Sequence, residues 1–117
     1  VAVTGVQTWL FRSNVNADTL AGSLAARLKA KRLVIAGATP GVLDKKNETI
    51  HRLDKERIEK LVKSGTANAG MVAKLAACQA ALKGGVRSVV IVDGRTPSRL
   101  VKALKGEKTS ATTRIEG

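Results

Sequence analysis

Two short stretches carry the side chains best suited to chemistry. Asn14, Asn16 and Asp18 stand at alternate positions just before an amphipathic stretch, and Lys74 lies further along in a run of small and apolar residues. Amides that hold an anionic substrate, with an acid and a lysine nearby, can move a phosphoryl group without a covalent nucleophile. A simpler interpretation stays open for both stretches. Asn-x-Asn-x-Asp is also typical of a turn that caps a helix, and a lysine on an amphipathic helix is ordinarily solvated.

Two segments of small residues could lie against a nucleotide. Residues 37–41 follow an apolar run, and ligands of open α/β sheets bind beyond the carboxyl ends of strands. Taken alone, this loop is better explained as a tight exit from a strand. Residues 66–70 lead into the helix expected around Lys74, where free backbone N–H groups and the positive end of the helix dipole suit phosphate. The sequence holds neither of the glycine-rich phosphate-binding motifs G-x-x-x-x-G-K-[ST] and G-x-G-x-x-G. No cluster of His, Cys and Asp has metal-ligand spacing, so we expect no protein-bound metal.

The elements that must position these residues alternate between helix and strand. Leucines recur every four residues at 20, 24 and 28 and predict a helix over 17–30. The remaining pattern predicts further helices at 54–64, 71–82 and from 97, buried strands at 33–36 and 86–92, a hairpin excursion over 42–50, a last strand at 109–115, and a strand or ragged hairpin over 1–11. We therefore expect an α/β fold, a three-layer sandwich whose mainly parallel sheet is covered on both faces.

Composition narrows the function classes. The 117 residues hold 21 Lys and Arg against 9 Asp and Glu, a formal net charge of +12, which attracts polyanions or an acidic partner. The basic residues form no dense tract, which argues against nucleic acid. A single cysteine, Cys78, indicates a reducing compartment, and no long apolar run predicts a membrane span. With no signal pattern and no initiating methionine at Val1, we expect a trimmed chain in the cytoplasm.

Several motifs, in order, resemble the acetylglutamate kinases of the amino acid kinase family. Residues 14–22 (NVNADTLAG) resemble the family's N-x-N-A-D-x-x-A-G segment, residues 40–44 (PGVLD) its nucleotide loop, and residues 70–74 (GMVAK) its G-M-x-x-K segment. Gly84-Gly85-Val86 and Asp93-Gly94-Arg95 follow at the expected places. The similarity covers roughly residues 13–117, and its ordered blocks are more specific than any single motif.

The resemblance implies phosphoryl transfer from ATP to the side-chain carboxylate of N-acetyl-L-glutamate, a step of arginine biosynthesis. It implies that Asn14 binds the substrate's carboxylate with Asn16 close by, that Asp18 organises the catalytic lysines, and that Lys74 stabilises charge on the transferred group. It makes residues 1–31 the end of the substrate-binding lobe and residues 32–117 the nucleotide-binding lobe. Mg²⁺ would be bound to the ATP phosphates. The resemblance is also compatible with a homo-oligomer. The residues implied to line the nucleotide site are Ala38, Thr39, Pro40, Gly41, Val42, Leu43, Thr66, Ala67 and Asn68.

The sequence also departs from the family pattern. Gly37-Ala38 stands where the family has a Ser/Thr-Asp pair, so an acid that helps to hold the nucleotide is absent, and the Gly-Thr-x-Ile ending becomes Thr112-Thr113-Arg114-Ile115. The family's amino-terminal lobe supplies a glycine-rich phosphate loop, a second lysine and a substrate-binding arginine. Without that lobe we expect an incomplete site and little turnover from this chain alone. Two alternatives remain: a kinase for an amino acid on an acidic carrier protein, or a non-catalytic module that binds nucleotides or polyanions.

Overall fold

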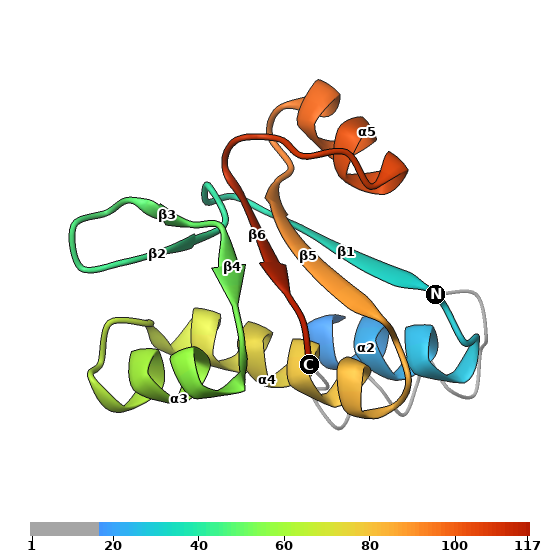
Figure 1. Cartoon of the computed structure of the whole chain (residues 1–117), viewed down its shortest axis with the longest axis horizontal. Coiled ribbons are helices and arrows are strands. Elements are labelled where there is room, and N and C mark those ends of the chain that lie inside the picture. Colours follow the sequence, from blue (N-terminus) through green and yellow to red (C-terminus); the bar gives the residue numbers. More distant parts are fainter. Residues whose placement is uncertain (1–16) are drawn as a thin grey trace.

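The computed structural model describes residues 17–117, whose centre is a four-stranded sheet in the order β1-β5-β6-β4. β1 (Arg32–Gly37) and β5 (Ser88–Asp93) are parallel, as are β4 (Arg52–Leu53) and β6 (Thr112–Ile115). β5 and β6 run antiparallel. A separate two-stranded hairpin pairs β2 (Val42–Leu43) with β3 (Thr49–Ile50) and projects beside the sheet (Figure 1).

Helices cover the two faces of the sheet unequally. α2 (Ala17–Arg27), α3 (Lys55–Lys63) and α4 (Ala69–Lys83) lie on one face, and α5 (Pro97–Lys105) lies on the other (Figure 1). α5 packs mainly against β5 and β1. The result is the predicted three-layer α/β arrangement, with the α5 layer thinner than the layer opposite.

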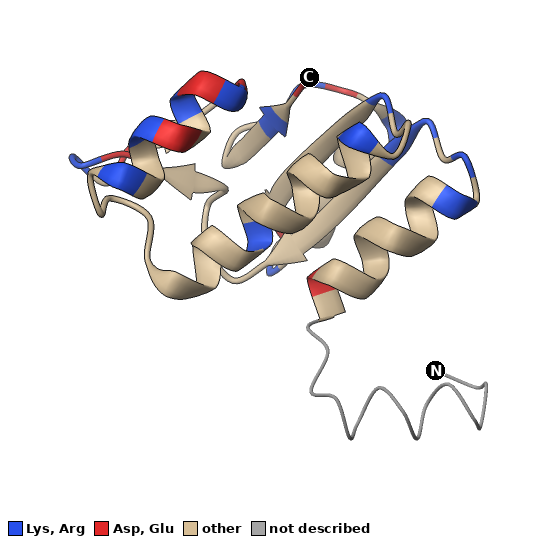
Figure 2. Ribbon diagram, turned by 90° about the horizontal axis from the view of Figure 1, so that it is seen from below, with Lys and Arg blue, Asp and Glu red and all other residues tan. Residues whose placement is uncertain are grey.

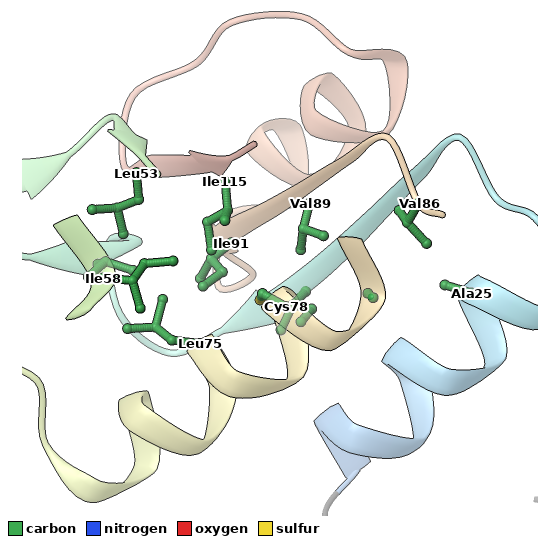
Figure 3. Packing of buried hydrophobic residues seen from close by; sticks show 12 residues of the cluster. Ala25, Leu53, Ile58, Leu75, Cys78, Val86, Val89, Ile91 and Ile115 are labelled. Atoms are coloured by element: carbon green, nitrogen blue, oxygen red, sulfur yellow. The ribbon is translucent and has the colours of Figure 1, made fainter. Parts of the chain in front are cut away.

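β5 separates two hydrophobic clusters because its side chains alternate between the faces of the sheet. Val89 and Ile91 belong to the larger cluster, under α2, α3 and α4, together with Leu75, Cys78 and Ile115 (Figure 3). The smaller cluster lies under α5 and holds the remaining buried β5 valines, Val90 and Val92, and Ala103. Cys78 is a buried core residue, as its place on the apolar face of its helix predicts. This burial raises the pKa of its thiol to about 12.

The helix ends follow from local sequence signals. Asp54 caps α3 by accepting a hydrogen bond from the Arg57 N–H at 2.8 Å, and Asn68 caps α4 in the same way through the Met71 N–H at 2.8 Å. Pro97 opens α5, and Gly106 ends it in the left-handed conformation, with φ of 81°.

The structure corrects three details of the sequence prediction. The strand at 33–36 is less buried than predicted: Leu33 and Val34 pack half-buried on opposite faces and only Ile35 of β1 is buried. Among the described strands, β1 pairs with β5 alone. β4 and the antiparallel β5–β6 pair were not predicted. The leucine repeat does not form the buried side of α2: Leu24 is 53% exposed, and Leu28, just past the helix, is 70% exposed, whereas Gly22 and Ala25 are buried. The helix ends at Arg27, not at residue 30.

Two parts of the prediction are not tested by the described residues. The strand or hairpin at 1–11, Asn14 and Asn16 lie outside the described residues. The division into 1–31 and 32–117 stays a prediction; α2, which precedes that boundary, packs against α4, which follows it.

Candidate active site

An ion pair joins the two residues for which the sequence predicts catalytic roles. Lys74 Nζ lies 2.9 Å from Asp18 Oδ2, and each side chain is 21% exposed. Asp18 is in the first turn of α2 and Lys74 is in the second turn of α4. Both side chains of the pair are therefore mostly shielded from water but not fully buried.

Small residues set the distance between these two helices. A Cβ built on Gly22 would lie 3.0 Å from the Ala77 carbonyl oxygen, and one built on Gly84 would lie 2.7 Å from Ala26 Cβ. Contacts of 18 with 74, 22 with 77, and 26 with 84 show that α2 and α4 run in the same direction, side by side (Figure 2). Both helices consequently present their amino-terminal ends, the positive ends of their dipoles, on the side where Asp18 and Lys74 meet.

The loop after β1 is held by the last strand of the sheet. The buried Thr113 hydroxyl accepts a hydrogen bond from the Val42 N–H at 2.8 Å and donates one to the Ile50 carbonyl. Gly41 has φ of 73°, and a Cβ there would lie 2.6 Å from Thr113 Oγ1, so only glycine fits. Thr49 Oγ1 donates to the Pro40 carbonyl at 2.8 Å. Residues 38–43 thus form a supported loop at the carboxyl end of β1.

The second predicted segment forms the amino-terminal boundary of α4. Asn68 is the helix cap, the Ala67 N–H donates to the Leu61 carbonyl at 3.4 Å, and Thr66 Oγ1 lies 2.8 Å from Ser64 Oγ. These hydrogen bonds lie within residues 61–71, whereas those of the 38–43 loop reach to Thr49 and Thr113. Among the described residues, no hydrogen bond joins the two nucleotide-loop candidates, whereas Asp18 and Lys74 are in direct contact.

A third charged group lies next to the 38–43 loop, and sequence reasoning assigned it no role. Asp93 ends β5 opposite Gly37, and the Gly94 N–H donates to the Gly37 carbonyl at 2.8 Å. The Asp93 side chain is 5% exposed and accepts three hydrogen bonds from Arg95, at 2.9 Å from Nε, 2.8 Å from Nη2 and 3.0 Å from the backbone N–H. These hydrogen bonds lower the pKa of Asp93 to about 2. The available signal was an acid at the end of an apolar strand, two residues before an arginine.

Within residues 17–117, no three His, Cys, Asp and Glu side chains come together in a way that could hold a metal ion. None of the helices in this range is long and apolar enough to cross a membrane.

Solved structures with the same arrangement define the class of fold. N-acetylglutamate synthase from Neisseria gonorrhoeae, complexed with coenzyme A and N-acetyl-glutamate, superimposes with a TM-score of 0.78 at 23% identity, covering 88% of this chain and 24% of that one. Carbamate kinase from Giardia lamblia bound to AMP-PNP gives 0.67 at 21% identity, covering 86% of this chain and 32% of that one. At these identities the likeness shows the fold, which is that of the amino acid kinases.

Sequence comparison then gives the family. The profile described as the amino acid kinase family matches residues 1–93, and the chain belongs to this family. Acetylglutamate kinase of Bartonella quintana (strain Toulouse) is 41% identical over 99 residues, which are 85% of this chain and 33% of the relative. Acetylglutamate kinase of Rhodopseudomonas palustris (strain BisA53) is 46% identical over 91 residues, 78% of this chain and 30% of the relative. The chain spans about a third of the length of these curated relatives.

Proposed function

We propose that this chain forms the nucleotide-binding part of an acetylglutamate-kinase-like enzyme, which transfers a phosphoryl group from ATP to the side-chain carboxylate of N-acetyl-L-glutamate. The observation that carries the proposal is the 2.9 Å ion pair between Lys74 and Asp18 at the amino-terminal ends of two parallel helices. Similarity to acetylglutamate kinases supports the choice of substrate.

In this proposal Lys74 stabilises the negative charge that develops on the transferred phosphoryl group. Phosphoryl transfer depends on positioning and on positive charge around the transferred group, not on a protein nucleophile. Asp18 would hold the ammonium of Lys74 in one place, so that little reorganisation is needed when negative charge builds up. Asn14 would bind the substrate's carboxylate, with Asn16 close by.

The nucleotide would lie against the two supported loops. Residues 38–43 offer backbone and small side chains, and residues 66–68 lead into the first turn of α4. Gly70 in that turn has no side chain, and a Cβ there would have only Asn68 Oδ1 nearby, at 3.6 Å, so a phosphate oxygen can approach its backbone. ATP would bring Mg²⁺ bound to its phosphates. Ala38 supplies no carboxylate to this loop, so nucleotide binding would rest on backbone groups and Lys74.

The test uses this chain joined to the amino-terminal lobe of a similar acetylglutamate kinase. We expect Lys74→Ala to lower kcat by about 100-fold or more with little change in the KM for ATP, because an interaction made mainly in the transition state is lost. The matched control is Lys83→Ala, which removes an exposed lysine at the other end of α4. Near-normal kcat in Lys74→Ala would remove this lysine from the chemistry.

A second measurement tests the need for further groups. The described residues supply one lysine for the phosphates, so we expect the 117-residue chain alone to phosphorylate N-acetylglutamate slowly or not at all. Turnover by the chain alone at the rate of the joined protein would contradict the proposed incomplete site.

The net charge of +12 favours one alternative, a kinase whose amino acid substrate is attached to an acidic carrier protein. Capture of this chain by an acidic carrier at low salt, lost at high salt, would support that alternative. A chain that shows no thermal shift with Mg²⁺ and ATP would instead support a non-catalytic module.

A further inference from the structure

A cavity with a basic rim lies on the α5 side of the sheet, on the face opposite α2 and α4. It has a volume of about 270 Å³, and its floor includes Val90 of β5 and Ala103 of α5, both buried. Val90 and Ala103 belong to the smaller hydrophobic cluster, whereas α2 and α4 pack on the larger one. The cavity is therefore separate from the Lys74–Asp18 site.

Two arginines on neighbouring strands form one wall of this cavity. Arg52 of β4 and Arg114 of β6 are paired in register, and both line the cavity. Their neighbours Leu53 and Ile115 are buried on the other face, because side chains alternate along a strand. Like charges on directly paired positions of neighbouring strands destabilise a sheet unless another charge compensates them.

Within the described residues, negative charge compensates the positive charge of these two arginines only in part. Arg114 Nη1 is 3.8 Å from Glu116 Oε1, which is a long contact for an ion pair. The rim adds one lysine, Lys108, and one acid, Glu107, so that three basic side chains face one acidic side chain. Positive charge therefore exceeds negative charge around the cavity.

The remaining rim groups suit oxygen atoms of a ligand. Thr109 and Thr112 line the cavity, and a threonine hydroxyl can donate to an anionic oxygen. Arginine guanidinium groups bind carboxylate and phosphate through two parallel hydrogen bonds. The volume lies just below the range of sites that hold drug-sized ligands, about 300–1,000 Å³, so the ligand must be small.

We propose that this cavity is a binding site for a small multivalent anion, a phosphate ester or a polycarboxylate, which neutralises the paired Arg52 and Arg114. The apolar floor of Val90 and Ala103 accommodates the carbon part of such a molecule, and the basic rim holds its charged groups. This site is additional to the proposed nucleotide and substrate sites, and binding here requires neither Lys74 nor Asp18.

The experiment is calorimetric titration of the 117-residue chain with pyrophosphate and, separately, with citrate, in a low-salt buffer free of phosphate. We expect saturable binding of at least one of these probes at a single site. The tighter probe identifies the chemistry, phosphate or polycarboxylate. Arg52→Gln should weaken that binding by about tenfold, the effect of one lost charge-assisted hydrogen bond. Arg52 is exposed, so this variant retains the fold, and Arg114→Gln serves as a second variant once its folding is checked.

Two controls separate this site from general attraction and from the proposed active site. Arg27→Gln removes one exposed arginine from α2, on the opposite face, and should change the affinity by less than about twofold. Lys74→Ala should leave unchanged the binding that Arg52→Gln weakens, even where pyrophosphate also occupies the proposed nucleotide site. The proposal is overturned if neither probe shows saturable binding, if Arg27→Gln and Arg52→Gln weaken it equally, or if Lys74→Ala abolishes it while Arg52→Gln leaves it unchanged.

Discussion

Asp18, in the first turn of α2, accepts a 2.9 Å hydrogen bond from Lys74 Nζ, a residue of α4 that lies 56 positions further along the chain. This contact is possible because Gly22 and Gly84 let the two helices approach closely in a parallel arrangement. The helix–helix packing and the candidate active site are thus one structural unit, and changes to either should affect both.

The ion pair should contribute measurably to stability. We expect Asp18→Asn and Lys74→Met each to lower the free energy of unfolding by about 1 kcal/mol, because each removes the charge-assisted contact between two largely shielded side chains. A double-mutant cycle by urea unfolding should give a coupling free energy of about 1 kcal/mol between the two residues. Effects of the two substitutions that simply add would show that the pair contributes no interaction energy.

Gly84 should not tolerate a side chain. Its φ of −79° suits any residue, so the cost of Gly84→Ala comes from the added methyl group, which would lie 2.7 Å from Ala26 Cβ and 3.3 Å from the Ala80 carbonyl oxygen. We expect a loss of about 1–3 kcal/mol in the free energy of unfolding, measured in urea. Gly37→Ala is the matched control, since nothing lies within 4 Å of the added Cβ. Rescue of Gly84→Ala by Ala26→Gly would locate the clash, and equal losses at Gly37 and Gly84 would contradict it.

The Thr113 hydroxyl should hold the loop that follows β1. Thr113→Val keeps the shape of the side chain but leaves the Val42 N–H and the Ile50 carbonyl without this partner in a buried place. We expect a loss of about 1–3 kcal/mol in the free energy of unfolding. Thr112→Val, which removes one exposed hydrogen bond to the Ser110 carbonyl, should cost clearly less. Similar losses in the two variants would argue against a special role for Thr113.

The Asp93–Arg95 pair should make the free energy of unfolding depend on pH between about pH 4 and pH 2. Arg95 lowers the pKa of Asp93 from 3.8 to about 2 in the folded chain, so the folded state favours the ionised carboxylate. This stabilisation is complete above about pH 4 and is lost as the pH falls towards 2. Urea midpoints of the unchanged chain and of Arg95→Gln should therefore differ above pH 4 and converge near pH 2. A difference that stays constant across this range would contradict the assignment.

Features set by neighbouring residues were predictable from the sequence. The Asp54 cap, the helix stop at Gly84 and Gly85, the opening of α5 by Pro97 and the hairpin at 42–50 follow from local hydrogen bonding and backbone preferences. The family and the α/β fold were also predictable, because several ordered motifs and the alternation of helix and strand each indicate them.

Features set by distant residues were not predictable. The pairing of β4 with β6 joins residues 52 and 114, and two residues are too short a strand to leave a sequence pattern. The buried side of α2 cannot be inferred from its leucines, although leucines usually mark the packed side of a helix. Here Gly22 and Ala25 face α4, since only small side chains permit so close an approach.

The sequence by itself determined most of the elements, several helix ends and the residue types capable of phosphoryl transfer, because these depend on side-chain chemistry and short-range backbone preferences. Only the tertiary structure decided that Asp18 and Lys74 meet, that Thr113 supports the 38–43 loop, and that Arg52 lies beside Arg114. Each of these contacts joins segments at least 56 positions apart, and their geometry is set by close packing of helices and by strand register.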